Sequence, residues 1–132
     1  MTIAAKIEDH QARCQPHLLR LQMIACAEAG TVLSCQAVTE VIQAIEAILA
    51  EAEAAGSDAR AAAGGSTTSP GAGMFLGVRL TRLAAAANDV IAAAWAGDSA
   101  QMRRHLRRFD ALTSAIWTVH QAVYGPAHGR WC

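Results

Sequence analysis

Three side chains near the N-terminus have both the chemistry and the spacing of metal ligands. His10, Cys14 and His17 stand at positions i, i+4 and i+7. On an ideal helix they fall within about 60° of one another, and imidazole and thiolate groups are preferred ligands of zinc and copper. Further ligands could come from a neighbouring turn, at Cys26, Glu28 or Cys35. The spacing therefore predicts a candidate zinc or copper site. The simpler interpretation, which also stays open, is that these are exposed polar residues on a helix.

The residue types needed for nucleophilic catalysis are present, but the rest of an active site is not. Cys14 lies within reach of His10 or His17, yet no oxyanion-stabilising loop and no third, orienting residue can be identified. Glu51 and Glu53 are two positions apart, so on a helix they point to different sides and are better explained as a solvated face. We therefore assign no catalytic residue.

Two more histidines lie on the apolar side of a helix predicted for residues 98–124. His105 and His120 are about 22 Å apart along that helix at 1.5 Å per residue, so they cannot share a site. His120, beside Trp117, is the better candidate for a ligand or a base. A packed core histidine with one backbone hydrogen bond is the simpler explanation.

The opposite side of the same helix is basic. It carries four arginines, Arg103, Arg104, Arg107 and Arg108. Trp117, at the edge of the apolar side, is a candidate anchor for a helix–helix contact between subunits. These five residues are the predicted partner-binding set. The alternatives are a solvated face or pairing with the acidic helix within residues 31–55, and nucleic acid is the least favoured partner because the chain has zero net charge and a single lysine.

Composition indicates one soluble helical domain. The chain has 132 residues, 53% of them hydrophobic and 5% aromatic, and much of the hydrophobic fraction is alanine, which favours closely packed helices. Residues 1–59 carry three basic and eight acidic side chains, whereas residues 60–132 carry eight basic and three acidic ones. No CxxC pair, signal-peptide pattern or apolar run of membrane-spanning length occurs. We expect a cytoplasmic protein with reduced thiols that does not bind a membrane.

Apolar spacing and helix breakers divide the chain into four helices. The periodicity predicts helices over residues 3–29, 31–55, 74–96 and 98–124. Pro16 predicts a kink in the first helix, which counts against a metal site that uses both Cys14 and His17. Gly97 followed by Asp98 predicts a very short turn between the last two helices. Residues 56–73 are rich in glycine, serine and proline and read as a linker, long enough to cross the bundle and join parallel helices or to let a hairpin swap between chains.

The sequence thus predicts a single all-α domain, a four-helix bundle built from two helical hairpins. The hairpins are residues 1–55 and 74–124, the long Gly/Ser/Pro-rich linker 56–73 joins them, and residues 125–132 form an irregular tail. The favoured function is a non-enzymatic interaction or regulatory module that acts through helix faces as a homodimer. A metal- or small-ligand-binding bundle using histidine and cysteine, and a small enzyme with a pocket between helices, are the alternatives.

Overall fold

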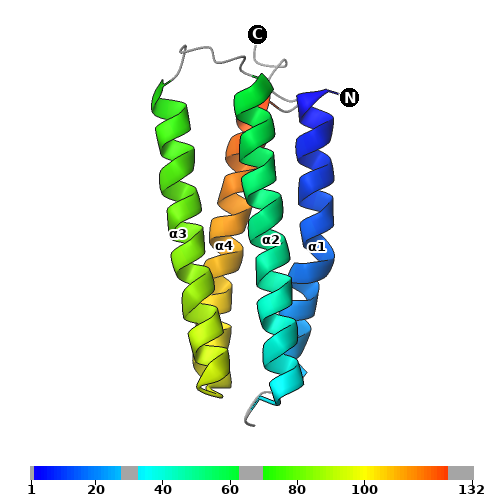
Figure 1. The fold of residues 1–132 in the computed structure, drawn as a ribbon, viewed down its shortest axis with the longest axis vertical. Helices are drawn as coiled ribbons and strands as arrows, with labels where there is room; N and C mark the ends of the chain where they lie inside the picture. The colour runs from blue at the N-terminus through cyan, green and yellow to red at the C-terminus, as the bar shows by residue number, and fades with distance from the viewer. Residues whose placement is uncertain (1, 28–32, 63–69, 125–132) are drawn as a thin grey trace.

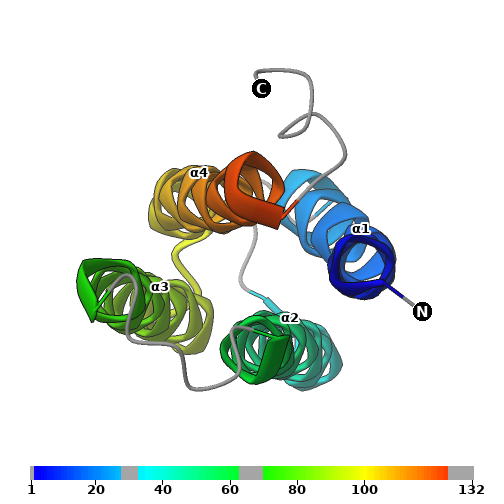
Figure 2. The same cartoon turned by 90° about the horizontal axis from the view of Figure 1, so that it is seen from above.

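A computed structural model of the protein describes residues 2–27, 33–62 and 70–124. Four α-helices account for nearly all of this part of the chain: α1 (Ile3–Ala27), α2 (Cys35–Ala62), α3 (Pro70–Trp95) and α4 (Ser99–Tyr124). Each helix runs antiparallel to the next, and the four stand at the corners of a bundle (Figures 1 and 2). α1 packs on α2 and α4, and α3 packs on α2 and α4, so α2 and α4 are diagonal. The predicted all-α four-helix bundle is confirmed.

The helix starts are fixed by side-chain caps. Thr2, Ser34 and Asp98 accept hydrogen bonds at 3.0–3.1 Å from backbone N–H groups three residues further on, at Ala5, Ala37 and Gln101. Such caps satisfy donors that the first turn of a helix leaves without an intrahelical partner. They define where α1, α2 and α4 begin.

The predicted short turn between α3 and α4 is confirmed. Gly97 has a φ of 70°, a left-handed conformation that glycine adopts without steric cost. The Asp98 N–H donates to the Ala93 carbonyl at 3.0 Å and the Gly97 N–H donates to the Ala94 carbonyl at 3.1 Å, the Schellman pattern of a helix end. Residue Asp98 then caps α4 directly, so the two helices form a tight antiparallel hairpin.

The predicted boundaries of the linker are wrong. α2 continues through Gly56 to Ala62, and α3 already begins at Pro70. A glycine inside a helix costs only about 1 kcal/mol, and the alanines beyond it favour the helix, with Ala59 buried against the bundle. Proline suits the first position of a helix because its missing N–H is not needed there. Residues 63–69 lie outside the described part, as do residues 125–132, where a tail was predicted.

The direction of the helices also removes one alternative for the linker. α2 ends and α3 begins at the same end of the bundle, where the N-terminus also lies (Figure 1). A connection across the bundle between parallel helices, which the predicted length of the linker would allow, is therefore wrong. The hairpins join as antiparallel neighbours.

The core is built from all four helices. Its largest fully buried side chains include Leu21, Ile45, Leu83 and Phe109, one from each helix. Four alanines of α3 are buried with them and let the neighbouring helices approach closely: Ala86, Ala87, Ala93 and Ala94. In the described residues, no helix is both long and apolar enough to span a bilayer.

Candidate functional site

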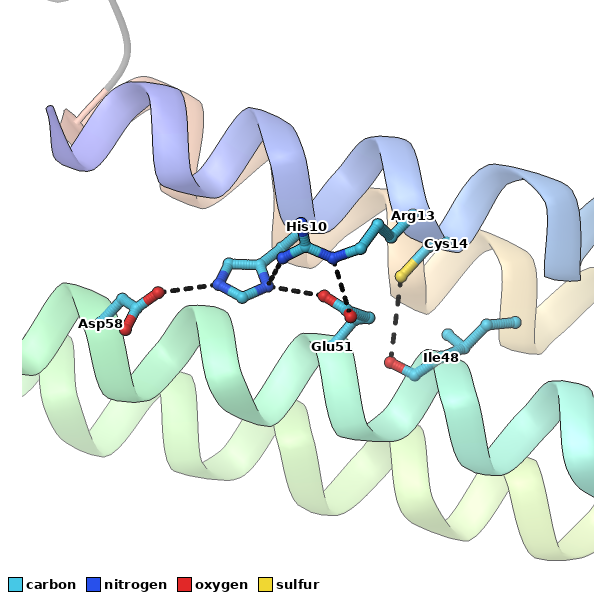
Figure 3. Close-up of polar contacts among 6 residues, drawn as sticks. All are labelled: His10, Arg13, Cys14, Ile48, Glu51 and Asp58. Atoms are coloured by element: carbon cyan, nitrogen blue, oxygen red, sulfur yellow. Dashed lines mark hydrogen bonds and ion pairs between the residues drawn. The ribbon is translucent and has the colours of Figure 1, made fainter. Parts of the chain in front are cut away.

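A cluster of polar side chains links α1 to α2 in the half of the bundle that contains the N-terminus (Figure 3). His10 of α1 is only 8% exposed, and both of its ring nitrogens face carboxylates of α2. Nδ1 lies 2.6 Å from Glu51 Oε2, and Nε2 lies 2.7 Å from Asp58 Oδ2. An imidazolium ring donates a hydrogen bond from each nitrogen, whereas the neutral ring donates from only one. Two carboxylates at these distances therefore suit the charged ring.

Arg13, one turn further along α1, completes this cluster. Its Nε donates to Glu51 Oε1 at 3.0 Å, and its Nη2 lies 2.9 Å from His10 Nδ1. Two cationic side chains of α1 thus share the carboxylate of Glu51. The contact with Glu51 requires Nδ1 to donate a hydrogen bond, whereas a hydrogen bond from Arg13 would require Nδ1 to accept one, so only one of the two is formed at a time. We call His10, Arg13, Glu51 and Asp58 the interhelix cluster.

The charges of the interhelix cluster stabilise one another. Partial burial opposes ionisation of Glu51, but hydrogen bonds from Arg13 and His10 outweigh it and lower the pKa of this carboxyl. The hydrogen bond from His10 lowers the pKa of Asp58, and the hydrogen bond to Glu51 raises the pKa of Arg13. Both carboxylates are therefore ionised at neutral pH, and the cluster is a set of ion pairs that joins two helices.

Cys14 lies next to the interhelix cluster but is not reactive. Its side chain is fully buried, with Sγ 4.0 Å from the carbonyl oxygen of Ile48. Burial, together with the nearby charge of Glu51, raises the pKa of this thiol to about 12. The thiolate is the nucleophilic and metal-binding form of cysteine, so at neutral pH Cys14 offers neither chemistry.

The three residues predicted as a metal site do not come together as one. His10 directs its two nitrogens to opposite sides of the ring, each toward a carboxylate; Cys14 points into the core; and His17 is partly exposed. Within residues 2–27, 33–62 and 70–124, no group of three or more histidine, cysteine, aspartate or glutamate side chains is placed to hold a metal ion. Glu51 and Asp58 cannot replace the missing ligands, because opposite nitrogens of one ring cannot bind the same ion.

We expect the thiols to react in an order that follows their burial. Cys35 is exposed on α2 and should be modified quickly by a thiol reagent at pH 7.5, whereas Cys14 should react only on unfolding. Time-resolved alkylation followed by peptide mass spectrometry measures the rate at each position. Modification of Cys14 in the folded protein as fast as that of Cys35 would contradict its placement in the core.

Asp58 was missed by the sequence prediction, and Glu51 was assigned to a solvated face. The predicted helix ended at residue 55, so Asp58 fell in the supposed linker. Glu51 and Asp58 are seven residues apart, a spacing that places both on one face of a continuous helix. That spacing, with the alanines beyond Gly56, is the signal that could have indicated a longer helix with an acidic face toward α1.

The two histidines of α4 occupy different environments. His120 is buried, its ring centre lies 6.1 Å from that of Trp117, and burial, then the nearby charge of His10, lowers its pKa. His105 is partly exposed, with Nδ1 4.0 Å from Asp89 Oδ2 on α3. Trp117, predicted to contact a partner, is 3% exposed, and its indole N–H has no hydrogen-bond partner in the described part of the chain.

The arginines of α4 do not pair with the acidic face of α2, which lies diagonally across the bundle. Arg104, Arg107 and Arg108 are exposed, and none of them forms an ion pair within the described residues. Arg103 donates from Nη1 to the Ala25 carbonyl of α1 at 3.5 Å. The basic side of α4 is thus an exposed surface next to the C-terminal half of α1.

The outer side of α1 carries an exposed apolar stripe, which we call the α1 ridge. Its residues follow alternating steps of four and three: Ala12, Pro16, Leu19, Met23 and Cys26. All five are exposed, including Leu19 at 57% and Met23 at 63%. Steps of four and three are the spacing of a helix face that packs on another helix. The sequence prediction did not identify this stripe, because a second apolar face on α1 packs in the core.

A groove runs along each side of the α1 ridge. The groove toward α4 has a volume of about 850 Å³, and the groove toward α2 has a volume of about 670 Å³. Half of the twelve residues that line the α1–α4 groove carry neutral amide or hydroxyl groups: Gln11, Gln15, Gln22, Ser114, Thr118 and Gln121. Trp117 also lines it. The amide and hydroxyl groups can both donate and accept hydrogen bonds, and Asp110 is the one charged side chain among the lining residues.

Comparison with known proteins adds no relative from which a function could be transferred: no protein-family model, no curated protein and no solved structure matches this chain.

Proposed function

We propose that the protein is a non-enzymatic interaction module that acts through its helix faces as a homodimer, with the α1 ridge as the contact surface. The observation that carries the proposal is the exposure of Leu19 and Met23 in a regular apolar stripe. Burying a side chain of this size contributes about 1.5–3 kcal/mol. Val78 and Trp95 of α3 are also exposed, but they are 17 residues apart and form no such stripe. A contiguous apolar stripe favours a surface that another helix covers.

A second copy of the chain is the partner that fits the shape of this surface. In a two-fold dimer the same patch of both copies must be complementary to itself. The α1 ridge has a groove on each side, so the ridge of one copy can enter a groove of the other while its own groove receives the partner's ridge. This is the ridge-into-groove packing by which helices usually associate.

The polar cluster between α1 and α2 favours a structural role over catalysis. The nitrogens of His10 are occupied by Glu51 and Asp58, and the thiol of Cys14 is buried and protonated. Neither group has a free position from which it could attack a substrate or bind a metal. We propose that the interhelix cluster holds α1 on α2 and thereby fixes the orientation of the α1 ridge for its partner.

The mass of the protein in solution tests the proposal. The chain has a mass of 13.8 kDa, and we expect light scattering of the tag-free protein to give twice this value at micromolar concentration and to decrease on dilution. A monomeric mass up to millimolar concentration would contradict the homodimer.

A further inference from the structure

We infer that two copies pair antiparallel through the α1 ridge, and that Arg104, Arg107 and Arg108 of each copy bind the acidic N-terminal end of α1 of the other. This inference rests on the proposed homodimer and adds its orientation and the residues that decide it. Three features of the described residues carry it: the opposite charge of the two ends of the surface, the symmetry of the ridge, and the absence of internal partners for the arginines.

The surface formed by α1 and α4 has an acidic end and a basic end. Near the N-terminus of α1, Gln11 lies beside Gln121 at 2.8 Å, and Glu8 and Asp9 are exposed there. At the other end, Arg103 reaches the Ala25 carbonyl at 3.5 Å, which places the arginine-bearing turns of α4 beside the C-terminal half of α1. The two charges lie at opposite ends of the same ridge.

Only an antiparallel arrangement brings these opposite charges together. If the two copies were parallel, each group of arginines would face the same group of its partner. Like charges brought together across an interface cost free energy and oppose assembly. In the antiparallel arrangement, the basic end of each copy meets the end of the partner that carries Glu8 and Asp9. The three exposed arginines, which form no ion pair within residues 2–27, 33–62 and 70–124, then acquire a carboxylate from the other chain.

The two ends of the α1 ridge are placed symmetrically about Leu19, whereas Pro16 and Met23 are three and four residues from it. Ala12 and Cys26 are each seven residues from Leu19, one on either side. A two-fold axis at Leu19 therefore brings Leu19 of the two copies together and places Ala12 opposite the partner's position 26. The small side chains at the ends of the ridge allow close approach, and the large ones, Leu19 and Met23, fill the centre.

Cross-linking between position 12 and Cys26 tests the orientation in the full-length chain. Ala12→Cys is made in a background with Cys35→Ser and Cys132→Ser, and a short bismaleimide is added. Within one copy, positions 12 and 26 are about 21 Å apart along α1 at 1.5 Å per residue, too far for a short linker. We expect a covalent dimer whose cross-linked peptides join position 12 to Cys26. The background protein, which keeps Cys26 and the buried Cys14, should give much less.

Two controls accompany this experiment. Glu46→Cys places an exposed thiol on α2, away from the ridge, and should not increase the yield of dimer. Circular dichroism of each variant shows that the helices are intact.

A charge exchange tests the role of the arginines. Arg104→Glu, Arg107→Glu and Arg108→Glu together should raise the dimer dissociation constant at least tenfold at low salt. Adding Glu8→Lys and Asp9→Lys to the same chain should restore much of the affinity, whereas Arg82→Glu on the exposed side of α3 should have little effect. Failure of the second exchange to restore binding would overturn the assigned contact.

The outcomes separate the orientation from the dimer itself. A dimer by light scattering that cross-links mainly between the Cys26 residues of the two copies overturns the antiparallel arrangement and leaves the proposed function standing. A dimer that forms no link between position 12 and Cys26 also overturns the arrangement alone. A monomer at every concentration overturns both.

Discussion

Replacing His10 with alanine is expected to lower the free energy of unfolding by about 2 kcal/mol. This value is the stabilisation typical of hydrogen bonds to charged groups, reduced because the two carboxylate partners are partly exposed. His10 joins α1 to both Glu51 and Asp58, so its removal leaves two carboxylates of α2 without their shared donor. For a chain of 132 residues, the melting temperature should fall by roughly 7 °C. Thermal unfolding followed by circular dichroism at pH 7 measures this loss.

The pH dependence of this effect has a defined sign. The pKa values of Glu51 and Asp58 are lowered in the folded protein from usual values of 4.5 and 3.8, so their contribution is fully present above these values. It is lost as the pH falls through the lowered, folded-state pKa values, because protons then bind the native carboxylates as well. The difference in stability between wild type and His10→Ala should therefore be smaller below about pH 4 than at neutral pH.

A matched variant shows whether the loss of stability is specific to this cluster or follows from replacing any partly exposed histidine. His105 is partly exposed and lies 4.0 Å from Asp89, so His105→Ala should change the melting temperature much less. Equal losses for the two variants, or a His10→Ala protein as stable as wild type at pH 7, would contradict the role assigned to the interhelix cluster.

Introducing charge on the α1 ridge is expected to separate the two copies. Leu19→Glu with Met23→Glu should raise the dimer dissociation constant at least about a hundredfold, which corresponds to about 2.7 kcal/mol. Two apolar side chains per copy lose their burial, each worth about 1.5–3 kcal/mol, and the new carboxylates of the two copies repel one another near the two-fold axis. Because both residues are exposed in the single chain, the free energy of unfolding of the monomer should change little.

The helices were predictable from the sequence because local signals define them. The apolar steps of α2, α3 and α4 and the Gly97–Asp98 turn all rest on short-range spacing, and the structure contains these elements, although α3 begins earlier and α2 ends later than predicted. The end of α2 was not predictable by the same rule. Gly56 usually marks a helix end, but here the alanines that follow it favour the helix and Ala59 packs in the bundle.

The polar cluster depends on pairing between helices, which spacing within one helix does not reveal. His10 was singled out for its chemistry, but its partners are 41 and 48 residues away on α2. The neighbours Cys14 and His17 suggested a metal site only because an ideal helix places them near one another. Which of several polar neighbours a histidine meets depends on how α1 is rotated against α2, and the core on the other side of α1 fixes that rotation.

The exposed surface was predicted in part. The arginines of α4 were expected to lie opposite the core, and the structure leaves Arg104, Arg107 and Arg108 exposed. Pairing of these arginines with α2 would require α4 to pack beside α2, but the two helices lie diagonally across the bundle. The α1 ridge was missed because α1 has apolar residues on two sides, and only the packed bundle shows which side is left uncovered.

Sedimentation equilibrium of the wild type beside Leu19→Glu/Met23→Glu is the most direct test of the α1 ridge as a contact surface. Val78→Glu on α3 is the matched control, since Val78 is 44% exposed and lies on a different helix from the ridge. We expect the wild type and Val78→Glu to sediment as dimers with similar dissociation constants, and the double variant to sediment as a folded monomer. A wild type that is already monomeric, or a double variant that dimerises as tightly as Val78→Glu, would contradict the ridge as the contact surface.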